Sequence, residues 1–238
     1  MSKLRILLTG SGGMVGRNLL EHSSIGDFDV LAPRRIELDL CDFSALQAYL
    51  QANKPDIVIH AAGKVGGIQA NMREPVDFLL ANLDMGRNVV WASQQAGIKR
   101  LINLGSSCMY PRNHSEPLKE DMVLKGELEP TNEGYALAKV VTARLCDFIM
   151  REDASYQYKT LIPCNIYGRF DKFDPVHSHL IPAIIHKVHQ AKQSGQELVE
   201  IWGDGSVVRD YLYIDDLTAA FLAALAYDGT ETVFNIGS

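Results

Sequence analysis

The chain has 238 residues, of which 47% are hydrophobic and 22% are charged, a composition typical of a soluble globular protein with one large domain or two small ones. Its 29 acidic and 23 basic side chains give a net charge of -6, which argues against general binding to nucleic acids or anionic membranes, because both are polyanions. No apolar run approaches the roughly 20 residues that span a bilayer, and the N-terminal stretch has no secretory h-region. The four cysteines lie far apart without a CxxC pair, so we expect reduced thiols and a cytoplasmic protein.

Short apolar runs alternate along the chain with segments of helical periodicity. Strands are predicted over 4–9, 28–33, 56–62, 100–107, 159–168, 198–202, 208–213 and 233–237. Helices are predicted over 13–21, 43–51, 76–96, 134–151, 179–193 and 215–227, with a polar loop over 108–133. This alternation predicts an α/β fold, a doubly wound parallel sheet of the Rossmann type.

The sheet is expected to divide the chain by function. Residues 1–165 are predicted to form the dinucleotide-binding Rossmann domain. Residues 166–238 are predicted to supply a smaller substrate-binding part and then return to the sheet. Because the chain stops within or just after its last predicted strand, we expect a C-terminal piece of the fold to be missing.

A glycine cluster stands between the first predicted strand and the first predicted helix. Gly10, Gly13 and Gly16 have the spacing GxxGxxG. Glycines in this position let the backbone turn tightly and approach a pyrophosphate, which sits on the helix N-terminus. The alternative is a tight turn without a ligand, but the place directly after the first strand favours a dinucleotide site. Other residues assigned to the same cofactor are Met14, Val15, Asp39, Leu40, Ala61, Ala62, Lys139 and Asn165.

The end of the second predicted strand bears on the choice between NAD and NADP. An NAD site usually has an acidic residue there, which binds the ribose hydroxyls. Here the strand runs into Arg34 and Arg35, and guanidinium groups suit a 2′-phosphate through bidentate, charge-assisted hydrogen bonds. Glu37 and Asp39 lie close by and keep NAD open as the alternative, as does a solvated basic turn. The pattern favours NADP.

A tyrosine and a lysine four residues apart form the main catalytic motif. Tyr135 and Lys139 share one face of a predicted helix. A free tyrosine has a pKa of about 10, and a neighbouring ammonium favours the phenolate and lowers that value. Ser106, at the end of the preceding strand, completes a set that can protonate a carbonyl oxygen as hydride arrives. An amphipathic helix with a surface lysine is the alternative.

Several longer motifs occur in a fixed order along nearly the whole chain. Besides the glycine cluster they are KVGGI at 64–68, GSSCMYP at 105–111, LEPTNEGYALAK at 128–139, PCNIYG at 163–168, HSHLIPAII at 177–185 and WGDGSVVRDYLYIDD at 202–216. On these motifs the chain resembles the extended short-chain dehydrogenase/reductase superfamily and, within it, the GDP-L-fucose synthase family. The resemblance implies a homodimeric enzyme that uses NADPH to epimerise C3 and C5 and reduce C4 of a GDP-4-keto-6-deoxy-hexose.

The resemblance also implies roles for individual residues. It makes Ser106, Tyr135 and Lys139 the catalytic triad, with Cys108 and His179 as the acid/base pair of epimerisation. Residues implied to contact the substrate are Lys64, Asn165, His179, Lys187, Trp202 and Arg209. Lys187 stands where the family has an arginine, and the loop after Gly10 lacks a basic residue that some relatives carry.

The chemistry of that pair can be stated from the residue types. A 4-keto group acidifies the protons on C3 and C5. A neighbouring cation can lower the pKa of a thiol, and a histidine titrates near neutrality. Cys108 as a packed thiol is the alternative. Two other functions remain open, a plain NDP-sugar 4-reductase or 4-epimerase and a non-catalytic NADP-binding sensor. We expect no metal site at the histidines around His179.

Overall fold

The computed structural model describes residues 3–173, 178–201 and 203–237. Its main feature is a six-stranded parallel sheet with the strand order β2-β1-β3-β4-β5-β8. The strands are β1 (Arg5–Thr9), β2 (Asp29–Leu31), β3 (Ile57–His60), β4 (Arg100–Leu104), β5 (Gln157–Pro163) and β8 (Val233–Ile236). A second, two-stranded sheet pairs β6 (Asn165–Tyr167) with β7 (Tyr211–Tyr213). The predicted doubly wound α/β fold is confirmed.

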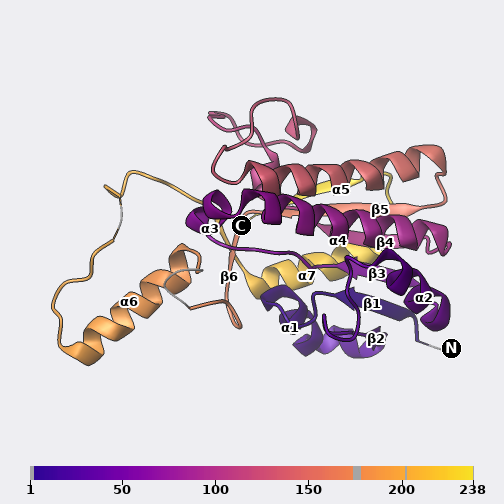
Figure 1. Ribbon diagram of the computed structural model, residues 1–238, viewed down its shortest axis with the longest axis horizontal. Helices are drawn as coiled ribbons and strands as arrows, with labels where there is room; N and C mark the ends of the chain where they lie inside the picture. Colours follow the sequence, from indigo (N-terminus) through magenta and orange to yellow (C-terminus); the bar gives the residue numbers. More distant parts are fainter. Residues whose placement is uncertain (1–2, 174–177, 202, 238) are drawn as a thin grey trace.

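Helices cover both faces of the large sheet (Figure 1). The helices of the described chain are α1 (Met14–Glu21), α2 (Phe43–Asn53), α3 (Ile68–Arg73), α4 (Pro75–Gln95), α5 (Glu133–Glu152), α6 (Leu180–Ser194) and α7 (Ile214–Ala226), of which α6 does not cover the sheet. Short 3-10 turns occur at η1 (Ser23–Asp27), η2 (Ser107–Met109) and η3 (Glu120–Met122). Within the described ranges, the search for a helix that is long and apolar enough to cross a bilayer finds none.

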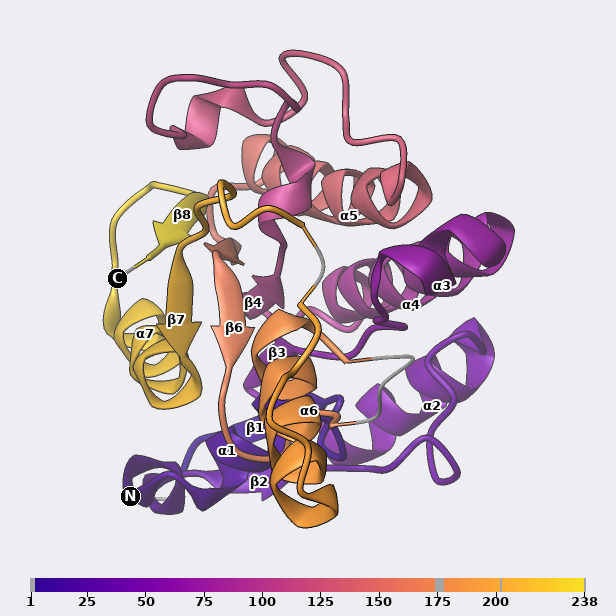
Figure 2. The same cartoon turned by 90° about the vertical axis from the view of Figure 1, so that its left-hand side faces the viewer.

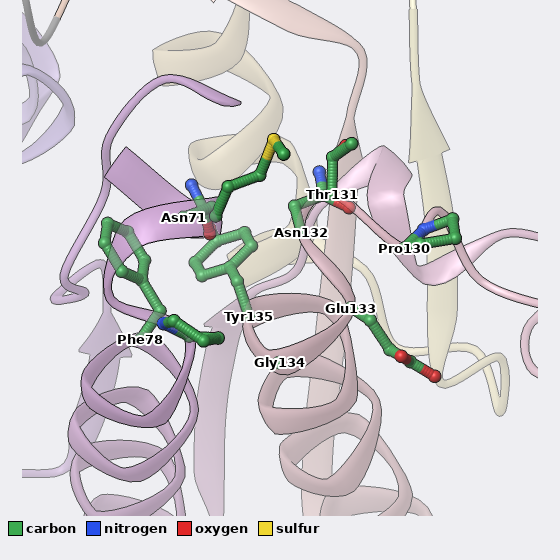
Figure 3. Close-up of a pocket in the computed structure, with 10 residues that line it drawn as sticks. Asn71, Phe78, Pro130, Thr131, Asn132, Glu133, Gly134 and Tyr135 are labelled. Atoms are coloured by element: carbon green, nitrogen blue, oxygen red, sulfur yellow. The ribbon is translucent and has the colours of Figure 1, made fainter. Parts of the chain in front are cut away.

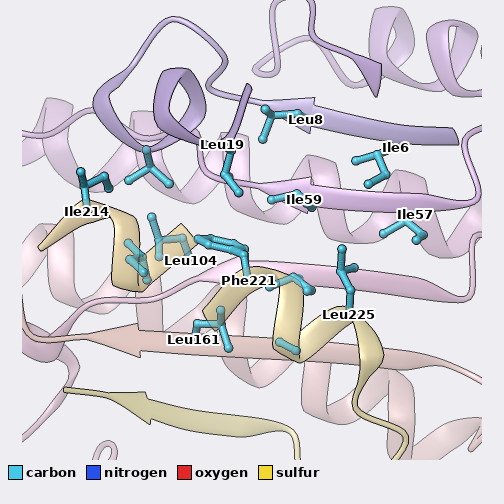
Figure 4. Close-up of a cluster of buried hydrophobic side chains, with 14 of the residues drawn as sticks. Ile6, Leu8, Leu19, Ile57, Ile59, Leu104, Leu161, Ile214, Phe221 and Leu225 are labelled. Atoms are coloured by element: carbon cyan, nitrogen blue, oxygen red, sulfur yellow. The ribbon is translucent and has the colours of Figure 1, made fainter. Parts of the chain in front are cut away.

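Two hydrophobic cores lie on opposite faces of the sheet because successive strand side chains point to opposite sides. Ile6 and Leu8 of β1 pack with α1 and α7, where Phe221 is fully buried (Figure 4). Leu7, between them, packs on the other face with α2, α4 and α5. Each strand is therefore apolar on both sides, which is the pattern of a parallel sheet covered by helices. This packing holds the carboxyl ends of the strands at one common edge.

One predicted strand is in fact two strands in two sheets. The prediction of one continuous strand over 159–168 was wrong, because β5 ends at Pro163 and β6 begins at Asn165. The amide of Cys164 still donates to Ile236 of β8 (3.0 Å), whereas that of Asn165 donates to Asp210 before β7 (3.3 Å). The chain thus changes partner between these two residues and leaves the large sheet.

Other differences concern the periphery. The strand predicted over 198–202 is absent from the described positions 198–201. Leu198 is 88% exposed, so the apolar residue that suggested a strand does not pack against a sheet. The strand predicted over 208–213 is reduced to β7, because β6 offers only three residues to pair with. Helix α3 and the turns η1, η2 and η3 were not expected.

Helix α6 projects away from the large sheet (Figure 1) and faces the viewer in the turned view (Figure 2). Its exposed apolar side chains include Leu180, Ile185 and Val188, each about half exposed. The segment before it approaches the loop after β3, since a Cβ on Gly67 would lie 3.6 Å from the carbonyl oxygen of Ser178. The start of α6, and His179 with it, therefore faces the loop that carries Lys64.

Candidate active site

In the large sheet, β2 lies on one side of β1, and β3 lies on its other side. The direction in which the chain adds strands therefore reverses between β1 and β3. Ligands of open α/β sheets bind outside the carboxyl ends of the strands at such a switch point. Three of the predicted groups converge there: the glycine loop after β1, Ala61 and Ala62 after β3, and Ser106 after β4.

Two glycines permit close approach of the backbone at the switch point. Gly10 has φ +76°, and a Cβ on it would lie 2.7 Å from the backbone of Ala61 and of Ala62. A Cβ on Gly16 would collide with the carbonyl oxygen of Gly10. A larger residue at Gly10 would therefore force the loop away from the end of β3, and a larger residue at Gly16 would force α1 away from the loop.

The N-terminus of α1 is open to an anion. Its N-cap residue, Gly13, makes no side-chain cap, and the first turn holds no acidic residue. The first amides of a helix, here those of Met14, Val15 and Gly16, have no partner within the helix and carry the positive end of its dipole. A Cβ on Gly12 would meet no atom within 4 Å, so the loop presents open space. These features fit the pyrophosphate of a dinucleotide.

The two acidic residues that kept NAD open are bound to backbone amides. Glu37 accepts a hydrogen bond from the amide of Arg34 (2.6 Å), and Asp39 accepts one from the amide of Cys41 (3.0 Å). Arg34 and Arg35 are exposed. Ser11 ties the glycine loop to the end of β2 through its hydroxyl, which lies 3.1 Å from the carbonyl oxygen of Ala32.

Two other residues predicted to bind the cofactor, Leu40 and Asn165, make their contacts away from the glycine loop. Leu40 is buried, and its carbonyl oxygen accepts from Asn88 (2.9 Å). Asn165 is exposed on β6 and donates to the carbonyl oxygen of Asp210 (3.0 Å). The described contacts of these two residues therefore lie outside the glycine loop.

The structure brings Ser106, Tyr135 and Lys139 together. Lys139 is buried, donates to the carbonyl oxygen of Leu104 at the end of β4 (2.8 Å), and has its Nζ 5.8 Å from the centroid of the Tyr135 ring. Burial lowers the pKa of Lys139 to about 8. Ser106 acts to lower the pKa of Tyr135, and its hydroxyl oxygen lies 3.1 Å from Sγ of Cys108.

Two expected pKa shifts have the opposite sign. Burial raises the pKa of Tyr135 above its ordinary value, and a hydrogen bond with Ser106 only partly offsets this. Burial also raises the pKa of Cys108 to about 11, although Ser106 and Lys139 act to lower it. The neighbouring cation is visible in the sequence, whereas the loss of water on burial is not, and this loss of water disfavours the charged form by more than the cation favours it. Both groups are therefore protonated at neutral pH.

His179 is exposed directly before α6. Its described neighbours are Ala183, whose amide donates to the His179 carbonyl oxygen (3.0 Å), and Asp171, whose pKa it acts to lower. Neither contact involves Cys108, so the structure does not bring the predicted acid/base pair into contact.

The residues predicted to contact the substrate are dispersed. Lys64 forms ion pairs with Glu74 (3.0 Å) and Asp77 (2.9 Å). Lys187, on α6, donates to the carbonyl oxygen of Glu200 (3.0 Å), and exposed Arg209 donates to that of Val208 (2.8 Å). Trp202 lies outside the described residues. Across the described part of the chain, no three His, Cys, Asp or Glu side chains are grouped as metal ligands.

A cavity of about 260 Å³ lies at Tyr135, between the first turns of α4 and α5 (Figure 3). It is lined by Asn71, Met72, Pro75, Phe78, Pro130, Thr131, Asn132, Glu133, Gly134 and Tyr135. Asn71 and Asn132 were not among the residues predicted to form the site. Asn132 lay inside a quoted motif, and Asn71 followed one by three residues, but nothing in the pattern separated either from a helix-capping residue.

The parallel sheet, the glycine loop at its switch point and the Ser106–Tyr135–Lys139 set define an oxidoreductase of the short-chain dehydrogenase/reductase type. The chain belongs to the NAD dependent epimerase/dehydratase family, whose profile matches residues 6–237.

Relatives within this family are nucleotide-sugar enzymes by name. The chain is 53% identical to the GDP-L-colitose synthase of Yersinia pseudotuberculosis over 214 residues, 90% of this chain and 70% of the relative. It is 47% identical to the GDP-L-fucose synthase of Azorhizobium caulinodans, over 93% of this chain and 70% of the relative. The predicted resemblance is thereby confirmed.

A solved structure shares the fold over the full chain. The crystal structure of a GDP-L-fucose synthetase from Naegleria fowleri bound to NADP superimposes with a TM-score of 0.90 and 26% identity. The match covers 100% of this chain and 78% of that one.

Proposed function

We propose that the protein uses NADPH to epimerise C3 and C5 and to reduce C4 of a GDP-4-keto-6-deoxy-hexose, which yields GDP-L-fucose. The observation that carries the proposal is the position of Ser106, Tyr135 and Lys139 beside the glycine loop, at the switch point of the sheet. The names of the relatives support the GDP-sugar as substrate.

NADPH fits the switch point, where it would supply the hydride. The amides at the start of α1 would hold its pyrophosphate, and the exposed guanidinium groups of Arg34 and Arg35 would bind its 2′-phosphate. The engagement of Glu37 and Asp39 with backbone amides supports this, because neither carboxylate is then directed to the ribose hydroxyls. The NADP named in the similar crystal structure agrees with this choice.

Tyr135 serves as the proton donor to the C4 oxygen. Its raised pKa keeps the phenol protonated at neutral pH, which is the form that a general acid needs. Lys139 is fixed by the Leu104 carbonyl oxygen, so its charge stays close to the phenolate that remains after transfer and stabilises it. Ser106 binds the same oxygen through its hydroxyl.

Cys108 and His179 serve as the acid/base pair of epimerisation. The ketone acidifies the protons on the two flanking carbons, so one group removes a proton and the other returns one on the opposite face. Cys108 is a neutral thiol two residues from Ser106, which suits the proton donor. His179 then acts as the base, from the segment that faces the loop after β3.

The remainder of the chain supplies the substrate side. We assign residues 1–165 to cofactor binding and 166–238 to substrate binding and the last strand of the sheet. The residues proposed to bind the GDP-sugar are Lys64, Asn165, His179, Lys187, Trp202 and Arg209. We propose the cytoplasm as the protein's location, which the four cysteines without a CxxC pair favour.

The protein is proposed to act as a homodimer. Val76 and Leu80 on α4, and Val141 and Phe148 on α5, are 46–65% exposed although they are apolar. Each pair follows helical spacing, and the two helices pack side by side. An exposed apolar stripe on paired helices suits burial against a second copy.

The test is turnover of GDP-4-keto-6-deoxymannose with NADPH, followed by NMR of the product. We expect NADPH oxidation and the signals of GDP-L-fucose. A product reduced at C4 with unchanged C3 and C5 would instead identify a plain 4-reductase, and NADPH binding without turnover would identify a sensor. Either result would contradict the proposal.

A second candidate product is GDP-L-colitose, which the relative at 53% identity is named for making. Colitose lacks the hydroxyl at C3 of fucose. Assays with GDP-4-keto-6-deoxymannose and with its 3-deoxy form separate the two candidate functions. A GDP-L-fucose synthase should have the higher kcat/KM for the first substrate, and a GDP-L-colitose synthase for the 3-deoxy form.

A further inference from the structure

Two buried amide oxygens at the Tyr135 cavity lack a hydrogen-bond donor. They are Oδ1 of Asn71, on α3, and Oδ1 of Asn132, immediately before α5. Both residues line the cavity together with Tyr135, and Figure 3 shows them on either side of the tyrosine ring. A buried acceptor without a partner is costly to the folded state, so a native structure that keeps two at one cavity points to a ligand that supplies the donors.

The orientation of Asn71 is fixed by the other end of its amide. Nδ2 donates to the carbonyl oxygens of Gly66 (2.9 Å) and Gly67 (3.1 Å). Only Nδ2 can donate, so Oδ1 is left on the opposite side as an acceptor. Asn71 is 7% exposed, and its oxygen is buried without a donor although the residue lines the cavity.

Asn132 is an N-cap residue that does not cap. Asparagine at this position ordinarily accepts from an amide in the first turn, but its side chain makes no such bond here. It lies three residues before Tyr135, and this spacing places side chains on one face at a helix start. Its oxygen thus lacks the ordinary capping partner, at a residue that lines the cavity together with Tyr135.

The lining selects a neutral group with hydroxyl donors. Two acceptor oxygens and the carboxylate of Glu133 disfavour a phosphate at this position. Met72, Pro75 and Pro130 supply apolar carbon on the rest of the wall, which suits the C–H face of a pyranose. The volume of about 260 Å³ lies below the roughly 300–1,000 Å³ of drug-sized ligand pockets, so it fits one ring and not a whole nucleotide sugar.

We propose that Asn71 and Asn132 form a hydroxyl-reading subsite beside Tyr135, in which they accept hydrogen bonds from the C2 and C3 hydroxyls of the hexose. This inference rests on the proposed function, in which Tyr135 protonates the C4 oxygen. With C4 held at the phenol, we assign the hydroxyl on the neighbouring carbon C3 to Asn132, which lies three residues before Tyr135 and lines the same cavity. Asn132 is thus a specificity-determining residue that distinguishes a 3-hydroxy from a 3-deoxy sugar.

The test compares GDP-4-keto-6-deoxymannose with its 3-deoxy analogue in the wild type and in Asn132→Leu. We expect the wild type to favour the hydroxylated substrate in kcat/KM by roughly 5- to 100-fold, because the 3-deoxy analogue leaves a buried acceptor unpaired, at a cost of about 1–3 kcal/mol. Asn132→Leu should lose most of that ratio by slowing the hydroxylated substrate, with the 3-deoxy analogue changed by less than about twofold. Asn132→Ala replaces it if the leucine variant does not fold.

Thr131→Val is the matched control. Thr131 lines the same cavity, but its hydroxyl is already bonded to Glu129 (3.0 Å), so the substrate ratio should stay at the wild-type value. An equal loss on both substrates in Asn132→Leu would mean a structural role and overturn the subsite. So would a wild type that is indifferent to the C3 hydroxyl or prefers the 3-deoxy sugar.

A binding measurement separates this inference from the proposed function. If the wild type turns over neither 4-keto sugar, the proposed function fails, and calorimetry with GDP-mannose and GDP-3-deoxymannose still decides the subsite. Tighter binding of GDP-mannose to the wild type, with the difference lost in Asn132→Leu, supports it. Equal affinities for the two sugars in the wild type overturn it.

Discussion

Thr9 and His60 share a hydrogen bond of 2.8 Å between Oγ1 and Nδ1, at the carboxyl ends of neighbouring strands β1 and β3. Both are almost fully buried. Thr9 precedes Gly10, and His60 precedes Ala61, whose backbone would collide with a Cβ on Gly10. The bond therefore joins β1 and β3 one residue before the glycine loop begins. It fixes the separation of the two strand ends at the switch point.

His60 makes stability depend on pH. Burial, with the charge of Lys139 in second place, lowers the pKa of His60 to about 3, whereas an unfolded histidine has a pKa of about 6.5. Between these values the unfolded chain binds one more proton, so the free energy of unfolding falls as the pH drops from about 6.5 to about 3, by at most about 1.4 kcal/mol per pH unit.

Urea unfolding at pH 6, 5 and 4 measures this dependence. His60→Gln removes the titration and keeps a side chain that can bond Thr9, so its slope should be shallower than that of the wild type by about the same amount. Acidic groups contribute equally to both curves and cancel in the comparison. Identical slopes would contradict the assignment of a neutral, buried His60.

Tyr135→Phe should remove most of the reductase activity and leave NADPH affinity within about twofold. The phenol is the proton source and touches no described part of the cofactor loop. Loss of a general acid costs roughly 10²- to 10⁴-fold in rate. Stopped-flow NADPH oxidation and fluorescence titration measure the two effects, and near-normal turnover would rule out the role. Lys139→Ala should lose activity and also weaken NADPH binding.

Cys108→Ser and His179→Gln should slow solvent-deuterium exchange at C3 and C5 far more than they change NADPH binding. Serine keeps a hydroxyl next to Ser106 but is a much weaker acid than a thiol, and glutamine cannot titrate. Neither change touches Tyr135 or Lys139, so a 4-keto sugar that is already epimerised should still be reduced. NMR follows exchange, and a uniform loss of exchange and reduction in well-folded variants would defeat the assignment.

Arg35→Ala should weaken NADPH selectively. The guanidinium is exposed at the end of β2, where only a 2′-phosphate would engage it, so the affinity for NADH should change little. Loss of one charge-assisted hydrogen bond of about 1.5–3 kcal/mol corresponds to roughly a 10- to 150-fold rise in the Kd for NADPH. Titration of both nucleotides into the wild type is the reference, and equal affinities there would already exclude an NADP preference.

Phe148→Glu should shift the protein toward the monomer. It places a charge in the middle of the exposed stripe of α4 and α5, and a buried unpaired charge opposes association. Leu198→Glu, at a position that is 88% exposed and outside that stripe, is the control. Sedimentation at several concentrations distinguishes the species, and a monomeric wild type would contradict the dimer.

Local patterns in the sequence determined most of the fold and the members of the catalytic set. Short continuous apolar runs identify the strands of the large sheet, because each strand must be apolar on both faces to be covered by helices, and apolar positions with a 3.6-residue period identify those helices. The glycine spacing and the four-residue step from Tyr135 to Lys139 are likewise local, so they could be interpreted without knowledge of the neighbours.

Only the tertiary structure decided the properties that depend on distant neighbours. Pairing partners split the 159–168 segment at Cys164, because β8 and the residue before β7 each take one of two successive amides. Burial reversed the expected pKa shifts of Tyr135 and Cys108, since loss of water outweighs the cation beside them. The unpartnered oxygens of Asn71 and Asn132 became apparent only when α3 and α5 met at one cavity, because solvation and hydrogen-bond satisfaction are set by what surrounds a side chain and not by its place in the sequence.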